Sequence, residues 1–135
     1  VVMAAAVADF RPVTVSSSKI KKDEGTPEIR LEPTPDILAE LGRSKPAGQV
    51  LVGFAAETGD ATASVLEHGR AKLARKGCDL LVVNDVSSGK VFSRDDNEVV
   101  ILGPALEAVE IAHASKTQIA GAILDRVVEL AKGSI

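Results

Sequence analysis

The sequence predicts an α/β fold with a mainly parallel sheet and a small antiparallel addition. Two apolar segments, VLVGFAA at 50–56 and DLLVV at 79–83, are typical of buried central strands. Between them lies a polar turn followed by a helical segment that ends at Gly77, so the order is strand, helix, strand. Residues 98–102 alternate as a further strand, and we expect 106–111 to pair back with them as a hairpin.

The composition of this 135-residue chain is that of one soluble globular domain, with 45% hydrophobic and 26% charged residues. A formal net charge of −3 argues against a nucleic-acid partner, because nucleic-acid-binding domains usually carry a basic excess. Cys78 is the single cysteine, which excludes an internal disulfide and favours a reducing cytoplasm. The longest apolar run, at 1–8, is too short to cross a membrane, and the two histidines predict no metal site.

The opening segment, Val1 to Phe10, is predicted to start as a buried strand and to end beside Asp9. Its run of alanines lets a ligand approach the backbone, and parallel α/β proteins bind ligands at the carboxyl ends of strands. A tightly packed internal strand is the simpler alternative. The chain starts inside this strand without an initiator methionine, which suggests that it is a fragment of something longer.

The next region predicts an edge strand and a short helix. The basic tetrad KIKK at 19–22 is usually a solvated surface, although one of its lysines can reach a phosphate. Residues 28–32 alternate as an edge strand. Thr34 is the predicted N-cap, with Pro35 at the first position of a helix that runs to about Gly42. A helix start can hold an anion through its backbone, but most caps only cap.

The helix after the first apolar run carries basic residues near its C-terminal end. This placement complements the helix dipole and needs no ligand to explain it. Lys72 and Lys76 are four residues apart, hence on one face, where they can hold one polyanion together. Both interpretations stay open at this point.

The final helix is predicted to begin at Ser115, which fits a capping box with Gln118. We interpret this helix as structural. Its expected apolar face consists of Ile119, Ile123, Val127 and Leu130.

Seven segments in order resemble phosphopantothenoylcysteine synthetase, the synthetase half of the bifunctional bacterial coenzyme A biosynthesis protein. They are AAAVADF, KIKK, TPDIL, GFAAET, KLARKG, DLLVVNDV and FSRDDNEV. The resemblance implies a Rossmann-like three-layer fold, with a flap and hairpin region used for homodimer contact. It also implies that residues 1–135 are the synthetase domain without its N-terminal glycine-rich portion.

By this resemblance the protein is a phosphopantothenate–cysteine ligase that uses CTP. The carboxylate of 4'-phosphopantothenate attacks the α-phosphate to give an acyl-cytidylate, and cysteine then displaces CMP. Mg²⁺ is expected with the triphosphate, and a flavin-dependent decarboxylase domain is expected to be fused or associated. Two alternatives stay open: a non-catalytic nucleotide-binding and dimerisation fragment of that enzyme, and a relative that uses ATP.

The matched positions also imply the residues that bind these ligands. Phosphopantothenate would lie close to Ala5 and Ala6. No catalytic residue is assigned, because the family's glycine-rich loop and the asparagine linked to the acyl-cytidylate lie upstream of Val1. The residues implied to contact CTP are Met3, Ala4, Ala5, Asp9, Lys19, Thr34, Pro35, Asp36, Ile37, Phe54, Lys72 and Lys76.

Overall fold

The computed structural model describes residues 1–135 except 6, 22–24, 59–62, 86–95, 104–107 and 134–135. The chain divides into two compact units. The larger unit consists of Val1–Ala4 and Leu38–Ile135, and the smaller unit is Ala5–Ile37. No helix within the described residues is long and apolar enough to span a membrane.

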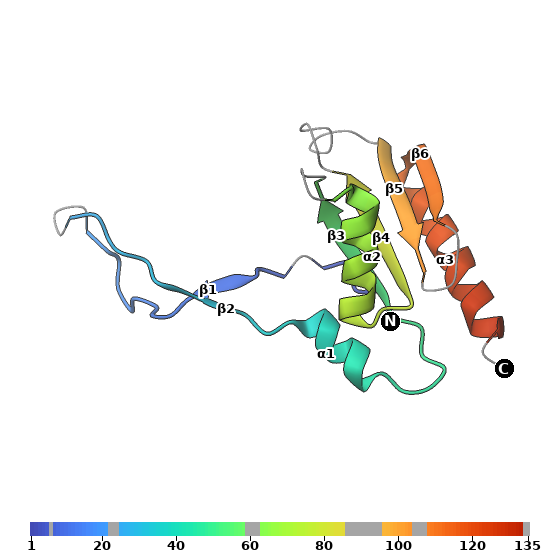
Figure 1. Ribbon diagram of the computed structural model, residues 1–135. Helices are drawn as coiled ribbons and strands as arrows, with labels where there is room; N and C mark the ends of the chain where they lie inside the picture. The colour runs from blue at the N-terminus through green and yellow to red at the C-terminus, as the bar shows by residue number, and fades with distance from the viewer. Residues whose placement is uncertain (6, 22–24, 59–62, 86–95, 104–107, 134–135) are drawn as a thin grey trace. The chain divides into compact units, whose positions relative to one another are not determined.

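The larger unit is built on a mixed sheet with strand order β3-β4-β5-β6 (Figure 1). These strands are β3 (Val52–Glu57), β4 (Leu80–Asp85), β5 (Asp96–Leu102) and β6 (Val109–Ser115). The pair β3 and β4 is parallel, whereas β5 runs antiparallel to β4 and to β6. The predicted α/β class and its strand–helix–strand unit are therefore confirmed. The predicted hairpin also forms, with its second strand later than expected; the predicted 106–111 segment begins outside the described residues.

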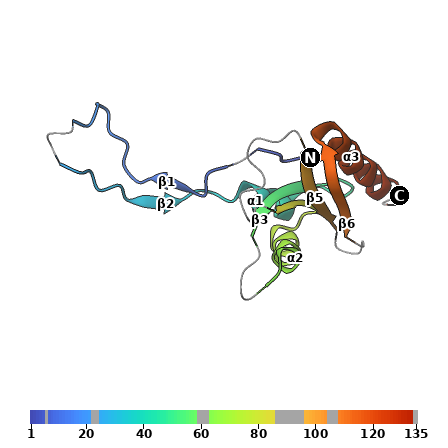
Figure 2. The same cartoon turned by 90° about the horizontal axis from the view of Figure 1, so that it is seen from above.

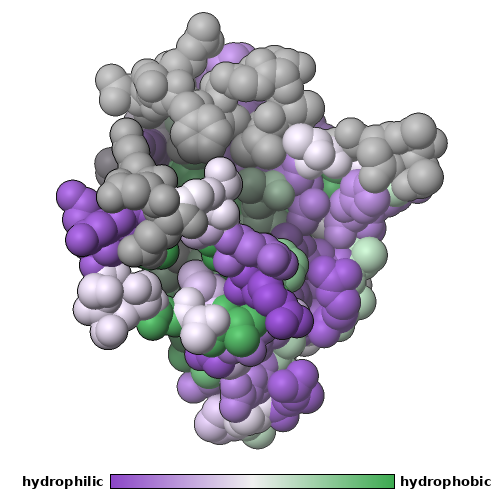
Figure 3. Space-filling model, turned by 90° about the vertical axis from the view of Figure 1, so that its left-hand side faces the viewer, coloured by the Kyte–Doolittle hydropathy of each residue, from purple (hydrophilic) through white to green (hydrophobic). Residues whose placement is uncertain are grey.

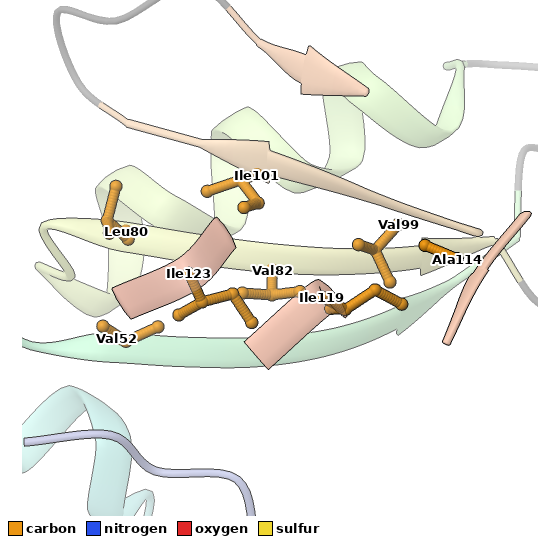
Figure 4. Close-up of a cluster of buried hydrophobic side chains, with 8 residues drawn as sticks. All are labelled: Val52, Leu80, Val82, Val99, Ile101, Ala114, Ile119 and Ile123. Carbon is orange, nitrogen blue, oxygen red and sulfur yellow. The ribbon is translucent and has the colours of Figure 1, made fainter. Parts of the chain in front are cut away.

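Two helices cover the opposite faces of this sheet, which gives the three layers (Figure 2). Helix α2 (Val65–Lys76) lies on one face and α3 (Lys116–Gly133) on the other. The core under α3 consists of Val52, Leu80, Val82, Val99, Ile101, Ala114, Ile119 and Ile123 (Figure 4). The core under α2 consists of Leu51, Ala55, Leu73, Cys78, Leu81, Val83 and Leu102. Alternate residues of β4 enter the two cores, as a strand buried on both faces requires.

Helix α2 ends, and helix α3 begins, where the sequence predicts. A capping box of Ser64 and Glu67 starts α2, and Gly77 ends it in the left-handed conformation, with φ of 65°. The amide of Ser115 donates to Gln118 Oε1 at 2.9 Å and the amide of Gln118 donates to Ser115 Oγ at 3.3 Å, which confirms the predicted capping box of α3. The apolar face of α3 packs on the sheet as expected.

The opening segment pairs with the side of β3 that faces away from β4, and it is exposed rather than buried. The amide of Met3 donates to the Val52 carbonyl, and the amide of Val52 donates to the Val1 carbonyl, each at 2.9 Å. Val1 and Val2 remain 52% and 48% exposed, so the prediction of a buried strand was wrong. The physical reason is that the segment lies at the edge of the sheet. Strand β4 pairs with one side of β3, and within the described residues only the opening segment pairs with the other side.

The smaller unit contains an antiparallel ribbon of β1 (Phe10–Pro12) and β2 (Leu31–Pro33). Arg11 lies opposite Glu32, and their side chains form an exposed ion pair at 2.8 Å. The predicted edge strand exists, although it starts later than residue 28. On the face that Figure 3 presents, hydrophobic residues lie among hydrophilic ones.

Helix α1 (Ile37–Ser44) begins later than predicted. Thr34 lies outside the helix, whose first residue is Ile37, and it bonds to the ribbon instead: its amide donates to the Asp9 carbonyl at 2.9 Å and its hydroxyl donates to the Ala8 carbonyl. The prediction that Thr34 is the N-cap was therefore wrong. Pairing across the ribbon uses the donors of Thr34, so the chain turns into the helix only at Ile37.

Gly42 brings α1 against the end of α2. A Cβ atom at Gly42 would lie 1.9 Å from the carbonyl oxygen of Lys76 and 3.2 Å from the Cα atom of Gly77. Such a distance to backbone cannot be relieved by a rotamer change. The absence of a side chain at Gly42 is therefore a packing requirement.

We predict that Gly42→Ala lowers the free energy of unfolding by about 2 kcal/mol or more, because α1 must move away from α2. Gly121→Ala in α3 is the matched control, since no described atom other than the neighbouring backbone of its own helix lies within 4 Å of the added Cβ. That substitution should raise stability by about 0.5–1 kcal/mol through helix propensity. Urea unfolding measures both variants, and shifts of the same sign would contradict the packing argument.

Candidate functional site

The last residues of β3 place their side chains alternately on the two faces of the sheet. Val52 belongs to the core under α3, so Phe54 and Ala56 lie on that face. Ala55 belongs to the core under α2, so Glu57 lies on the α2 face. Phe54 is 38% exposed, and it has the accessibility that a ligand-lining residue needs. The strand end therefore presents an aromatic group on one face and a carboxylate on the other.

Gly53 has groups close to its backbone, and they belong to the core of the larger unit. A Cβ atom there would lie 2.7 Å from Leu38 Cδ2 and 3.1 Å from both Cys78 Sγ and Leu81 Cδ1. The space beside Gly53 is filled by side chains of the same unit. This glycine therefore serves helix packing, and no ligand is needed to explain it.

Lys72 reaches the carboxyl end of β3 from α2. Its Nζ donates to Glu57 Oε1 at 2.8 Å, and both side chains are partly buried, with 28% of Lys72 and 19% of Glu57 exposed. Helical side chains lean towards the N-terminus of their helix, which here directs Lys72 towards the end of β3. The structure thus places a cation at the strand end where parallel α/β proteins bind ligands.

Lys76 lies four residues further along the same helix, about 6 Å further from the strand end. The continuous helix confirms that Lys72 and Lys76 share a face. Lys76 is half-buried, and its carbonyl oxygen contacts the position of Gly42. The two lysines are therefore not equivalent, because Lys72 is the nearer one to the end of β3.

The smaller unit brings together two of the predicted site residues. Asp9 and Thr34 are joined by a backbone hydrogen bond at the end of the ribbon. Lys19 is exposed in the same unit, and Ala6 lies outside the described residues. The predicted residues of the smaller unit are Ala5, Asp9, Lys19, Thr34, Pro35, Asp36 and Ile37. Those of the larger unit are Met3, Ala4, Phe54, Lys72 and Lys76.

The sequence analysis missed the partners of two acidic residues, Glu57 at the carboxyl end of β3 and Asp79 at the amino end of β4. Glu57 was assigned only to a turn, yet it is the last residue of β3 and the ion-pair partner of Lys72. Asp79 accepts hydrogen bonds from Lys45 Nζ at 2.5 Å and from the amide of Leu51 at 2.7 Å. An acidic residue directly beside an apolar strand is the signal common to both, but sequence alone cannot identify the partner.

A cavity of about 500 Å³ lies at the opposite edge of the sheet from Glu57. Its lining includes Cys78, just before β4 begins, and Gly103, just after β5 ends. Ligands of parallel α/β proteins bind at the other ends of the strands. The position of this cavity therefore argues against it as the candidate site, despite its volume.

The capping box at the start of α2 sets the position of Lys72 along the helix. The amide of Ser64 and its hydroxyl each donate to Glu67 Oε2 at 2.8 Å. These two hydrogen bonds, the backbone one first, lower the pKa of Glu67 below its ordinary value. The charged form of Glu67 is thus favoured in the folded protein.

We predict that part of the stability is lost as the pH falls through this lowered pKa, below the ordinary glutamate value of about 4.3. A carboxyl group with a depressed folded-state pKa stabilises the fold above its unfolded pKa and ceases to do so once protonated. Glu67→Gln should flatten this acid limb, and Glu129→Gln is the control. Urea midpoints between about pH 6 and pH 3 measure it. An unchanged acid limb in Glu67→Gln would contradict the role of the cap.

Comparison with known proteins gives a consistent set of relatives. Residues 1–130 match the family described as DNA/pantothenate metabolism flavoprotein C-terminal domain. The chain is 50% identical over 138 residues to the coenzyme A biosynthesis bifunctional protein CoaBC of Mycobacterium bovis, covering 98% of this chain and 33% of that protein. The Bacillus subtilis protein of the same name is 44% identical over 134 residues, with coverage of 98% and 32%. The chain thus spans about a third of the length of these curated relatives.

Solved structures share the fold. The crystal structure of the C-terminal domain of a coenzyme A biosynthesis bifunctional protein CoaBC has a TM-score of 0.70 and 32% identity, covering 96% of this chain and 53% of that chain. A Cab2 mutant in complex with phosphopantothenate-cysteine has the same TM-score at 23% identity, covering 97% of this chain and 44% of that chain. At that identity the second likeness shows a common fold alone.

Proposed function

This chain belongs to the DNA/pantothenate metabolism flavoprotein C-terminal domain family, and from that premise we propose that it is a phosphopantothenoylcysteine synthetase domain acting in coenzyme A biosynthesis. The family match over residues 1–130 is the observation that carries the proposal. It confirms the resemblance that the seven ordered segments indicated. The proposed reaction joins the carboxylate of 4'-phosphopantothenate to the amine of cysteine.

CTP is the proposed activating nucleotide, and an acyl-cytidylate is the proposed intermediate. Attack of the carboxylate on the α-phosphate releases pyrophosphate, and attack of the cysteine amine on the acyl carbon then releases CMP. Reaction at phosphorus depends mainly on positioning and on neutralising charge. The ammonium group of Lys72 supports the proposal, because it is a cation at the strand end where parallel α/β proteins bind ligands.

Mg²⁺ is proposed to accompany the triphosphate, whose charge it would help to neutralise. Among the described residues, no group of three or more histidine, cysteine, aspartate or glutamate side chains could hold a metal ion. Mg²⁺ is usually bound by substrate phosphates together with one or two carboxylates, so such a cluster is not required. Lys72 would add a positive charge from the protein itself.

The smaller unit supports the proposal that the protein is a homodimer. Large apolar side chains gather on it in exposed positions, including Val15 at 85%, Ile29 at 66%, Phe10 at 58% and Leu31 at 57%. A concentration of exposed apolar residues on one small unit is typical of an interaction surface. Because the named relatives are bifunctional, we also propose a fused or associated flavin-dependent decarboxylase domain. The single cysteine supports the proposal of a cytoplasmic location.

Calorimetric titration with CTP, ATP and GTP in magnesium buffer tests the nucleotide. We expect selective binding of CTP. Preference for ATP would overturn the CTP assignment and favour the ATP-using alternative. Absence of CTP binding, both in this chain and in a chain extended upstream through the glycine-rich portion, would overturn the synthetase proposal. Binding of CTP without amide formation by the extended chain would favour the non-catalytic alternative.

We predict that Lys72→Ala weakens CTP binding by about tenfold, as expected for a charged hydrogen bond. Lys76→Ala should weaken it less, because Lys76 is further from the strand end. Both variants should show a reduced salt dependence, since each removes one cation. Lys132→Ala, at the exposed end of α3, is the control. Unchanged affinity in both variants would remove these lysines from the site.

A further inference from the structure

We infer that Glu57 is a positioning residue that holds Lys72 in place for the phosphate groups of the nucleotide, an inference that rests on the proposed function. The two side chains come from β3 and α2, are 15 residues apart in sequence, and meet at 2.8 Å. The resemblance assigned no role to Glu57. Its proposed role is to act through Lys72 rather than on the substrate.

Lysine needs such a partner because its side chain is long and flexible. The ammonium group lies at the end of a flexible chain of four carbons, and the side chain loses considerable conformational freedom when a ligand fixes it. In this structure Glu57 already limits that freedom, and only 28% of Lys72 is exposed. Part of the ordering cost is therefore met before the ligand arrives, which is the advantage of preorganisation.

Glu57 is itself held by a rigid element. It ends a strand that pairs with β4 along its whole length, from Val52 opposite Leu80 to Glu57 opposite Asp85. Ala55, two residues earlier on the same face, is buried in the core under α2. The sheet therefore fixes the backbone of Glu57. The carboxylate of Glu57 in turn holds the ammonium group of Lys72 in place.

The ion pair leaves Lys72 able to bind an anion. An ammonium group has three N–H donors, and the bond to Glu57 Oε1 uses one of them. Within the part of the chain that the structure describes, this leaves two donors for phosphate oxygens. Protein kinases use the same chemistry, since the lysine that binds their phosphates is held by a glutamate of a neighbouring helix.

A competing effect has the opposite sign. The carboxylate of Glu57 repels a triphosphate and partly neutralises Lys72, so its removal would strengthen binding if charge alone mattered. Positioning predicts that its removal weakens binding. The sign of the change in CTP affinity therefore decides between the two roles.

The test compares CTP affinities of the wild type, Glu57→Gln, Glu57→Ala and the same changes combined with Lys72→Met. Glu57→Gln keeps the shape of the side chain and guards against misfolding in Glu57→Ala. We expect each single change at Glu57 to weaken binding about threefold or more, and to have no further effect when Lys72 is methionine. Glu129→Gln, which removes the carboxylate of the Arg126 ion pair on α3, is the control.

A second readout does not depend on the nucleotide. After reductive ¹³C-methylation of the lysines, the signal of Lys72 is identified by its loss in Lys72→Arg. In the wild type we expect it to lie apart from the signals of exposed lysines, and in Glu57→Gln to merge with them. An unchanged Lys72 signal in Glu57→Gln overturns the positioning role whether or not CTP binds.

The remaining outcomes are equally distinct. Unchanged or tighter CTP binding in the Glu57 variants overturns the positioning role and leaves the proposed function standing, because the wild type still binds CTP. Equal weakening by Glu57→Gln in the presence and absence of Lys72 shows that Glu57 acts by another route, which also overturns it. Absence of CTP binding by the wild type, both as this chain and as the chain extended upstream, overturns both proposals together.

Discussion

The parallel pairing of β3 with β4 is the constraint on which the larger unit depends. Its register runs without a break from Val52 opposite Leu80 to Glu57 opposite Asp85. Leu80, Leu81 and Val82 are at most 2% exposed, and alternate residues of β4 enter the two cores. Burial of such a side chain contributes roughly 1.5–3 kcal/mol, so the side chains of β4 stabilise both helical layers. A parallel pair also requires a crossover, and α2 is that connection.

The two ends of this pair have different tasks. At the amino ends, Asp79 joins the side chain of Lys45 to the backbone of Leu51, which fixes the loops that enter both strands. At the carboxyl ends, Glu57 and Lys72 form a partly buried ion pair. Stability is thus concentrated at one edge and candidate chemistry at the other, as in other parallel α/β proteins.

The smaller unit follows a different physical logic. Its ribbon pairs only a few residues, and its large apolar side chains are exposed. Main-chain pairing and the Arg11–Glu32 ion pair stabilise it locally, but an exposed ion pair contributes about 1 kcal/mol or less. A unit of this kind gains stability when a second surface covers its apolar residues. This is the physical basis for connecting it with dimer formation.

The sequence by itself determined the elements with strong local signals. The apolar strands, Gly77 as a helix end and the Ser115–Gln118 capping box were all predicted, because burial periodicity and capping act within a few residues. It also determined the family, through ordered motifs. Pairing across the chain was decided only by the tertiary structure. Thr34 forms hydrogen bonds across the ribbon, and the helix begins later than predicted. The opening segment lies exposed along one side of the sheet. The meeting of Glu57 with Lys72 depends on how α2 lies against β3, and no local pattern encodes that contact.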